Sequence, residues 1–386
     1  MPHLALLGVV YLAFISLGLP DSVLGVAWPA MRHTYGQPVQ AAGLITLILT
    51  LCSAVSSFAS ARVLRRLGVG PVVLISGCLT GGALLGYSLA PTFGWILLLA
   101  IPLGLGAGSV DAGLNHFVAE HYSSRHMNWL HGCWAVGATL GPLVMGVALA
   151  RPAGWQMGYT LIAGVQLALA ALFLLSLGLW RREHARPPKE ADIGGNRAAR
   201  KPPVAWASWL APCLYLVYAS IEVGTGLWAA TILVEHRKLE PAVAGIWVSC
   251  FFGAIMVGRF AVGVIAGQLG NRRLVRLGLL AALVGATLFS LDALPGALSL
   301  AGLVLLGLGC APVYPSLMHE TTRRFDADTA RAVVSRQVGF AYLGAALGPA
   351  ALGLLGAGLG LGTIMPAVML ALVLLYLLNG WLDRVS

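Results

Sequence analysis

Twelve long apolar runs dominate the sequence, and each is long enough to cross a lipid bilayer. Crossing the hydrocarbon core as a helix takes about 20 apolar residues. Only 10% of the residues are charged, and a water-soluble fold could not cover its surface with so few polar groups. The sequence therefore predicts an all-α membrane protein with twelve transmembrane helices. The runs cover 4–30, 39–61, 71–90, 94–119, 129–150, 156–179, 207–233, 242–266, 274–292, 296–318, 332–356 and 361–381.

Basic residues gather in alternate loops between these runs. Loops on the cytoplasmic side of a membrane carry an excess of Lys and Arg. The pattern predicts a multi-pass protein of a bacterial inner membrane with both termini in the cytoplasm. It also accounts for the net charge of +10 without a nucleic-acid partner. The basic loops contain Arg62, Arg65, Arg66, Arg125, Arg272, Arg273, Arg276, Arg323, Arg324 and Arg331, whereas the opposite loops contain Arg32, Arg151, Arg237 and Lys238.

The one long polar stretch lies at the centre of the chain, at 181–205. It is rich in Arg and Lys, with Pro and Gly interspersed, a composition typical of a flexible linker. We interpret it as a basic cytoplasmic linker between two six-helix bundles, 1–180 and 206–386.

The two halves repeat short motifs in the same order. Gly137-Ala-Thr-Leu-Gly-Pro142 matches Gly344-Ala-Ala-Leu-Gly-Pro349, which follows 207 residues later, and Gly104-Leu-Gly106 matches Gly307-Leu-Gly309 at an offset of 203. Agreement in both order and offset indicates an internal repeat. Parallel six-helix repeats are a known transporter design, with the substrate site near the membrane midplane.

The loops after the second and eighth runs carry a further motif. The second copy has Gly263, Gly267 and Gly270 followed by Asn and Arg272-Arg273, and the first copy has Arg65-Arg-Leu-Gly68. With twelve helices and a basic central loop, this motif resembles the major facilitator superfamily. The resemblance implies two pseudo-symmetric six-helix bundles that move a solute by alternating access. Both copies lack the Asp of the family's loop pattern, so the sequence does not supply the carboxylate of the usual charge-based latch.

Three segments resemble the fucose:proton symporter branch of that superfamily. They are Ser16 to Gly25 in the first run, Gly104 to Asn115 in the fourth, and Asn128 to Trp134 at the start of the fifth. In that branch, acidic residues of helices 1 and 4 line the sugar and proton pathway, and by motif they correspond to Asp21 and Asp111. The resemblance implies a proton-coupled sugar symporter, although this chain has Asp in helix 4 where the sugar carrier has Glu.

Three acidic residues lie inside predicted helices: Asp21, Asp111 and Glu222. A charged side chain at the centre of a membrane helix costs roughly 2.5–3.5 kcal/mol. None has Lys or Arg at helical spacing, so we expect them to face a hydrated passage and to carry protons. Asp21 has an alternative role, because it follows Gly18 and Pro20 and could cap a restarted helix.

Polar and aromatic residues near these acids are the predicted substrate-binding residues. Asn115 lies one helical turn from Asp111 on the same face, and aromatic rings can stack against sugar C–H surfaces. Each aromatic residue could equally be a packing residue or interface anchor, and His131 could relay protons or be structural. The predicted set is Asn115, Asn128, His131, Trp134, Tyr215, Tyr218, Trp228 and Gln337.

No enzyme motif occurs in the sequence, which lacks HExxH, GxxxxGK[ST] and GxSxG. We expect no catalytic residues, no metal and no cofactor, with transport driven by an ion gradient in a monomer. The alternatives are a proton-driven exporter of drugs or metabolites on the same fold, or a receptor or scramblase-like protein that transports no solute.

Overall fold

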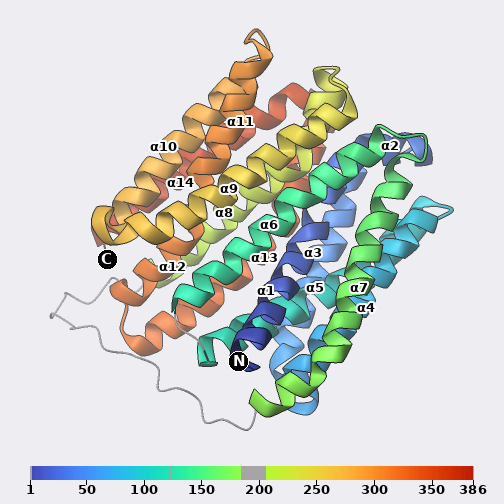
Figure 1. Ribbon diagram of the computed structural model, residues 1–386. Coiled ribbons are helices and arrows are strands. Elements are labelled where there is room, and N and C mark those ends of the chain that lie inside the picture. Colours follow the sequence, from blue (N-terminus) through green and yellow to red (C-terminus); the bar gives the residue numbers. More distant parts are fainter. Residues whose placement is uncertain (1, 122–123, 184–205, 386) are drawn as a thin grey trace. The chain divides into compact units, whose positions relative to one another are not determined.

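The computed structural model describes residues 2–121, 124–183 and 206–385, and the described chain is helical (Figure 1). The predicted linker lies almost entirely outside the described residues. The helices are α1 (Pro2–Asp21), α2 (Val23–Tyr35), α3 (Ala41–Leu67), α4 (Val69–Leu89), α5 (Phe93–His121), α6 (Ser124–Leu149), α7 (Gly154–Glu183), α8 (Ala207–Thr231), the π-helix η1 (Ile232–His236), α9 (Pro241–Leu269), α10 (Asn271–Ser290), α11 (Gly296–Cys310), α12 (Val313–Arg324), α13 (Ala327–Leu359), the 3₁₀ turn η2 (Leu361–Thr363) and α14 (Ile364–Val385).

Within the described residues, twelve helical segments are long and apolar enough to span a membrane, as predicted. Two of them contain breaks, and the sequence indicated only the one beside Pro20, through the alternative role of Asp21. The first span, Ala5–Tyr35, is interrupted at Ser22, and the tenth, Gly296–Arg324, is interrupted at Ala311 and Pro312. Proline stands at or just before each break. It causes the break because it lacks the N–H that would continue the helical hydrogen bonds.

The chain forms two compact units. Unit 1 contains residues 1–189 and 226–253, and unit 2 contains 190–225 and 254–386. This division differs from the predicted boundary, since residues 226–253, which include the end of α8, η1 and the start of α9, group with unit 1. Each unit is described below by itself.

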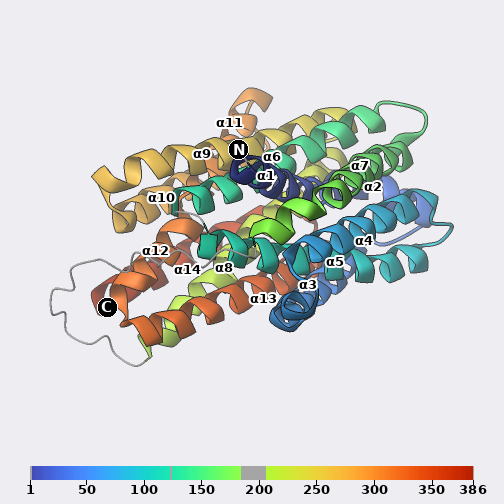
Figure 2. The ribbon, with the colours of Figure 1, turned by 60° about the horizontal axis from the view of Figure 1, so that its bottom comes forward.

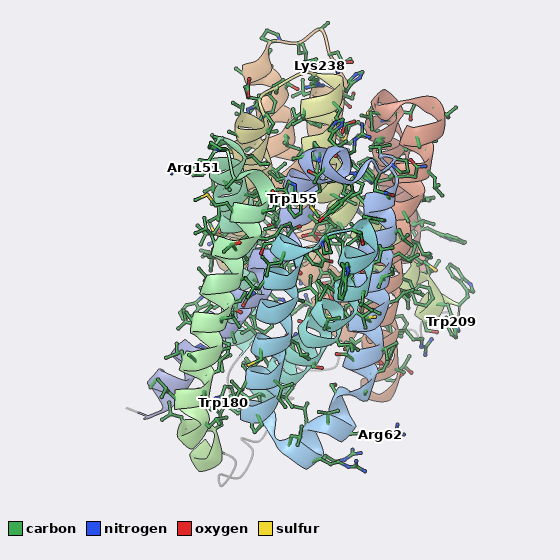
Figure 3. The ribbon with its side chains drawn as sticks, turned by 90° about the vertical axis from the view of Figure 1, so that its right-hand side faces the viewer. Arg62, Arg151, Trp155, Trp180, Trp209 and Lys238 are labelled. Atoms are coloured by element: carbon green, nitrogen blue, oxygen red, sulfur yellow. The ribbon has the colours of Figure 1, made fainter. Side chains whose placement is uncertain are left out.

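In unit 1, α4 packs against both α7 and α5, α3 packs against α5, and α1 packs against α6 (Figure 2). In unit 2, α10 packs against α11, α12 and α14. Figure 3 shows Arg62 and Trp180 toward one end of unit 1 and Arg151 and Trp155 toward the other. Arg62, in the last turns of α3, and Arg151, in the loop after α6, therefore lie at opposite ends of this unit, as their predicted places on opposite sides of a membrane require.

The repeated glycines make equivalent contacts in the two halves of the chain. A Cβ at Gly137 of α6 would overlap the Ile15 carbonyl oxygen of α1, and one at Gly344 of α13 would overlap the Leu216 carbonyl oxygen of α8. Their contacts Ile15 and Leu216 are 201 residues apart in the sequence. Small residues allow membrane helices to approach this closely, so the repeat in the sequence is also a repeat in packing.

A second repeated pair behaves in the same way. A Cβ at Gly106 of α5 would stand 3.1 Å from the Ser76 carbonyl oxygen of α4, and one at Gly309 of α11 would overlap the Gly278 carbonyl oxygen of α10. Each contact joins the corresponding helices of its own unit.

Prolines inside the helices leave carbonyl oxygens without their helical donors, because each proline lacks the N–H that would bond four residues back. Three of these oxygens accept a hydrogen bond from a side chain of another helix. The Ser16 carbonyl, four residues before Pro20, accepts from Gln166 Nε2. The Ala138 carbonyl, four residues before Pro142, accepts from Ser22 Oγ at 2.7 Å. The Ser208 carbonyl, four residues before Pro212, accepts from Arg336 Nη1 at 3.3 Å. In lipid, where no water can replace the missing donor, such partners are required.

Replacing Gly137 or Gly344 with Ala is expected to lower the free energy of unfolding by about 1–3 kcal/mol, because overpacking forces the backbones apart. Gly164→Ala in α7 is the matched control, since a Cβ there meets no atom within 4 Å. Thermal unfolding of the purified protein in detergent measures the difference. Equal melting temperatures for the three variants would contradict the packing role.

Gln166→Leu is expected to destabilise the protein by about 1–3 kcal/mol, because it leaves the buried Ser16 carbonyl unsatisfied. Pro20→Ala restores the N–H that this carbonyl lacks. In the Pro20→Ala background, Gln166→Leu should therefore cost clearly less, and a double-mutant cycle on thermal stability measures the coupling. Strictly additive effects would show that Gln166 does not compensate for the proline.

Candidate functional site

Asp21 lies at the break in the first membrane span, at the end of α1. Its side chain is exposed, and its Oδ2 accepts a hydrogen bond from Trp134 Nε1 of α6 at 2.8 Å. Ser22, which precedes α2, makes no side-chain capping bond. The carboxylate thus bonds to an indole from another helix, which favours the predicted exposed role over a capping role.

Asp111 and Asn115 form the polar pair predicted on α5. Asn115 Nδ2 donates to Asp111 Oδ1 and to the Asp111 carbonyl, both at 2.9 Å, and both side chains are partly exposed. Asp111 is near enough to Asp21 for the two carboxylates to repel each other. Unit 1 therefore brings together two predicted proton-binding acids, an amide and the Trp134 indole, although they come from three helices.

Glu222 of α8 is paired, which corrects the expectation that nothing offsets its charge. Arg259 Nη2 of α9 donates to Glu222 Oε1 at 3.0 Å in unit 2, and the two side chains are only 12% and 10% exposed. Helical spacing reveals only partners on the same helix, and Arg259 belongs to α9 whereas Glu222 belongs to α8. Arg259 is the single charged residue of the span Pro241–Leu269, and an ionisable residue at membrane depth is itself a signal of function.

Tyr215 and Tyr218 lie beside Glu222 on α8, but both are buried. Tyr218 donates to the Cys310 carbonyl at 3.0 Å and Tyr215 to the Tyr314 carbonyl at 2.8 Å, so both bond to backbone on either side of the break between α11 and α12. The Tyr218 hydroxyl also lies beside Glu222 and Arg259. These bonds give both tyrosines a structural function, and their predicted contact with substrate stays a prediction.

The remaining predicted residues are dispersed. His131 packs edge-on against Phe14 in unit 1, and Trp228 is fully buried there. Gln337 is buried in unit 2, where its Nε2 donates to Thr321 Oγ1 at 2.8 Å. Asn128 belongs to α6, but its side chain lies outside the described residues. Their roles in binding stay predictions.

An ion-pair network occupies the end of unit 2 where α10 begins and α12 and α14 end. Arg272 of α10 donates to Glu320 Oε2 of α12 at 3.1 Å, while Asp383 of α14 accepts from Arg324 and, at 2.8 Å, from Arg276. The loop motif of this half lacks its usual Asp, and its Arg272 pairs instead with carboxylates from α12 and α14. The sequence could not show this, because the partners are up to 111 residues apart.

A further ion pair joins α2 and η1 in unit 1. Arg32 of α2 binds Glu235 of η1 through both arms of its guanidinium, with Nη2 donating to Oε2 at 2.8 Å, and its Nη1 donates to the Gln37 carbonyl. Among the residues that the structure describes, His, Cys, Asp and Glu side chains do not gather in any group that could hold a metal ion.

Twelve membrane-spanning helices, packed through repeated glycine contacts and carrying acids at membrane depth, define a polytopic membrane transporter. Residues 10–349 match the model of the Major Facilitator Superfamily, and the chain belongs to this family.

Solved structures of transporters share its fold at low sequence identity. A bacterial homolog of the human lysosomal transporter Spinster, inward-facing and occupied, is similar with a TM-score of 0.75 at 15% identity, covering 100% of this chain and 97% of that one. A mutant form of the nucleoside transporter NupG is similar with a TM-score of 0.77 at 12% identity, covering 97% of this chain and 98% of that one. At these identities the likeness is one of fold.

Arg259→Gln is expected to destabilise the protein by about 3–5 kcal/mol, because it leaves the buried Glu222 carboxylate without its cation. Adding Glu222→Gln removes that uncompensated charge, so the double variant should recover much of the loss. Thermal unfolding in detergent measures all three variants. A double variant no more stable than Arg259→Gln alone would contradict the pairing.

Proposed function

We propose that the chain is a secondary active transporter that couples proton movement to the transport of a sugar or related small polar metabolite by alternating access. The observation that supports the proposal most is the exposed Asp21 carboxylate in the middle of the first span, held by Trp134 with Asp111 nearby.

Placing these acids at membrane depth costs free energy, which suggests that they are kept for a function. Asp21 and Asp111 lie within the spans Ala5–Tyr35 and Phe93–Asn115, where each charge costs roughly 2.5–3.5 kcal/mol. Their side chains are exposed or partly exposed, and we infer that they face a hydrated passage. Because two ionised carboxylates repel each other, a proton on either one relieves the repulsion. This pair is therefore suited to bind and release one proton.

Glu222 contributes to the proposal in a different way. Its carboxylate is already balanced by Arg259, so proton binding at Glu222 would require Arg259 to move away. The predicted coupling role of Glu222 thus depends on a conformational change, whereas that of Asp21 and Asp111 does not.

The groups beside the acids indicate the substrate class. Asn115 offers an amide and Trp134 an aromatic face, and sugars present both hydroxyls and C–H surfaces to such groups. The resemblance of the segments 16–25, 104–115 and 128–134 to the fucose:proton symporter branch supports the same substrate class. Coupling requires that substrate affinity differ between the protonated and ionised acids, since only differential affinity shifts a conformational equilibrium.

Asp111→Asn is expected to abolish accumulation driven by an imposed pH gradient, because the amide cannot exchange the proton. The assay is uptake into proteoliposomes of solutes that a thermal-shift screen of sugars and polar metabolites identifies. Asp292→Asn, in the exposed loop between α10 and α11, is the matched control and should transport normally.

Two outcomes of this assay would contradict the proposal. Full gradient-driven uptake by a folded Asp111→Asn variant would remove Asp111 from coupling. Accumulation that is the same with and without the gradient would remove proton coupling altogether. Solute movement opposite to an inward proton gradient would favour the exporter.

A further inference from the structure

A groove of about 480 Å³ lies in unit 2, between the beginning of α10 and the end of α14. Its floor includes Gly380, and the space above this glycine is open, since a Cβ built there would meet no atom within 4 Å. The groove is lined by Arg276, Tyr376, Leu377, Gly380, Trp381 and Arg384.

The charge around the groove is strongly positive. The adjoining ends of α10, α12 and α14 carry six arginines (Arg272, Arg273, Arg276, Arg323, Arg324 and Arg384) and two carboxylates, Glu320 and Asp383. The Asp383 side chain is buried and already shared between Arg276 and Arg324. Arg276 nevertheless remains 49% exposed, and Arg384 is exposed as well. Two guanidinium groups at the groove are thus accessible to an anion.

The rest of the lining is aromatic and apolar. Trp381 stacks on Trp206 of unit 2 with ring centroids 4.6 Å apart, and both rings remain partly exposed. Leu377, one turn closer to the middle of the span, is 62% exposed. Trp and Tyr favour the boundary between lipid headgroups and acyl chains, so the arginines lie at headgroup level and Leu377 lies toward the acyl chains.

We propose that this groove binds the headgroup of an anionic phospholipid. The phosphate lies between Arg276 and Arg384, the glycerol backbone lies over Gly380, and the acyl chains run along Leu377. Arginine is suited to this because its planar guanidinium binds phosphate oxygens in pairs. The charge distribution of the sequence predicts that this end lies at the cytoplasmic surface, where anionic lipids attract basic side chains.

Native mass spectrometry of the detergent-purified protein, titrated with dioleoyl phosphatidylglycerol or dioleoyl phosphatidylcholine, tests the site. The wild-type protein should retain phosphatidylglycerol preferentially. Arg384→Gln should weaken its retention about fivefold, which corresponds to the attraction of roughly 1 kcal/mol per basic residue. Gly380→Leu should abolish the preference by filling the groove.

Matched controls separate the groove from general effects. Arg66→Gln, at the exposed end of α3, removes the same charge elsewhere, and Gly164→Leu adds the same side chain to an open glycine of α7. Both should bind like the wild type. Equal retention of the two lipids, or an unchanged preference in Gly380→Leu, would overturn the proposal. Displacement of the lipid by an equal concentration of glycerol 3-phosphate would overturn its assignment to a lipid, since a soluble phosphate would then suffice.

Discussion

Backbone hydrogen bonding in lipid is the constraint on which much of this structure depends. A carbonyl freed by proline has no water to bond at membrane depth, so another helix must supply a donor. Gln166, Ser22 and Arg336 do this for Ser16, Ala138 and Ser208. Each of these bonds also joins two helices, so the prolines inside α1, α6 and α8 create links between helices. The break beside Pro20 has a further consequence, because it is where the Asp21 carboxylate emerges.

Glycine supplies the complementary half of this packing. Where Gly137 and Gly344 face carbonyl oxygens of α1 and α8, no side chain fits between the helices. Close backbone contact replaces the hydrophobic driving force, which is weak between helices surrounded by lipid. Since the same contacts recur about 200 residues apart, the two halves use one packing scheme with different side chains around it. The acids inside the spans differ accordingly: Asp21 and Asp111 of unit 1 are exposed or partly exposed, whereas Glu222 of unit 2 is in an ion pair.

Charge is managed differently at the ends of the helices and at membrane depth. At the ends, Arg272 and Arg276 bind Glu320 and Asp383 and remain partly exposed, consistent with contact with headgroups. At depth, Glu222 and Arg259 neutralise each other within a buried contact, while Asp21 keeps an indole as its partner. We propose proton exchange for the accessible acids, whereas the paired acid depends on Arg259 to offset its charge.

The sequence by itself determined the number and approximate bounds of the spans, the repeat, the family and the polar pair of α5. These follow from local properties: apolar length, the spacing of glycines, and residues one helical turn apart. Tertiary structure alone decided that Arg259 pairs with Glu222, that Glu320 and Asp383 pair with Arg272 of the loop motif, and that Tyr215 and Tyr218 bond to backbone. Each of these contacts joins helices far apart in the chain. Periodicity tells which face of a helix a side chain occupies, but only the packing of helices decides what lies opposite that face.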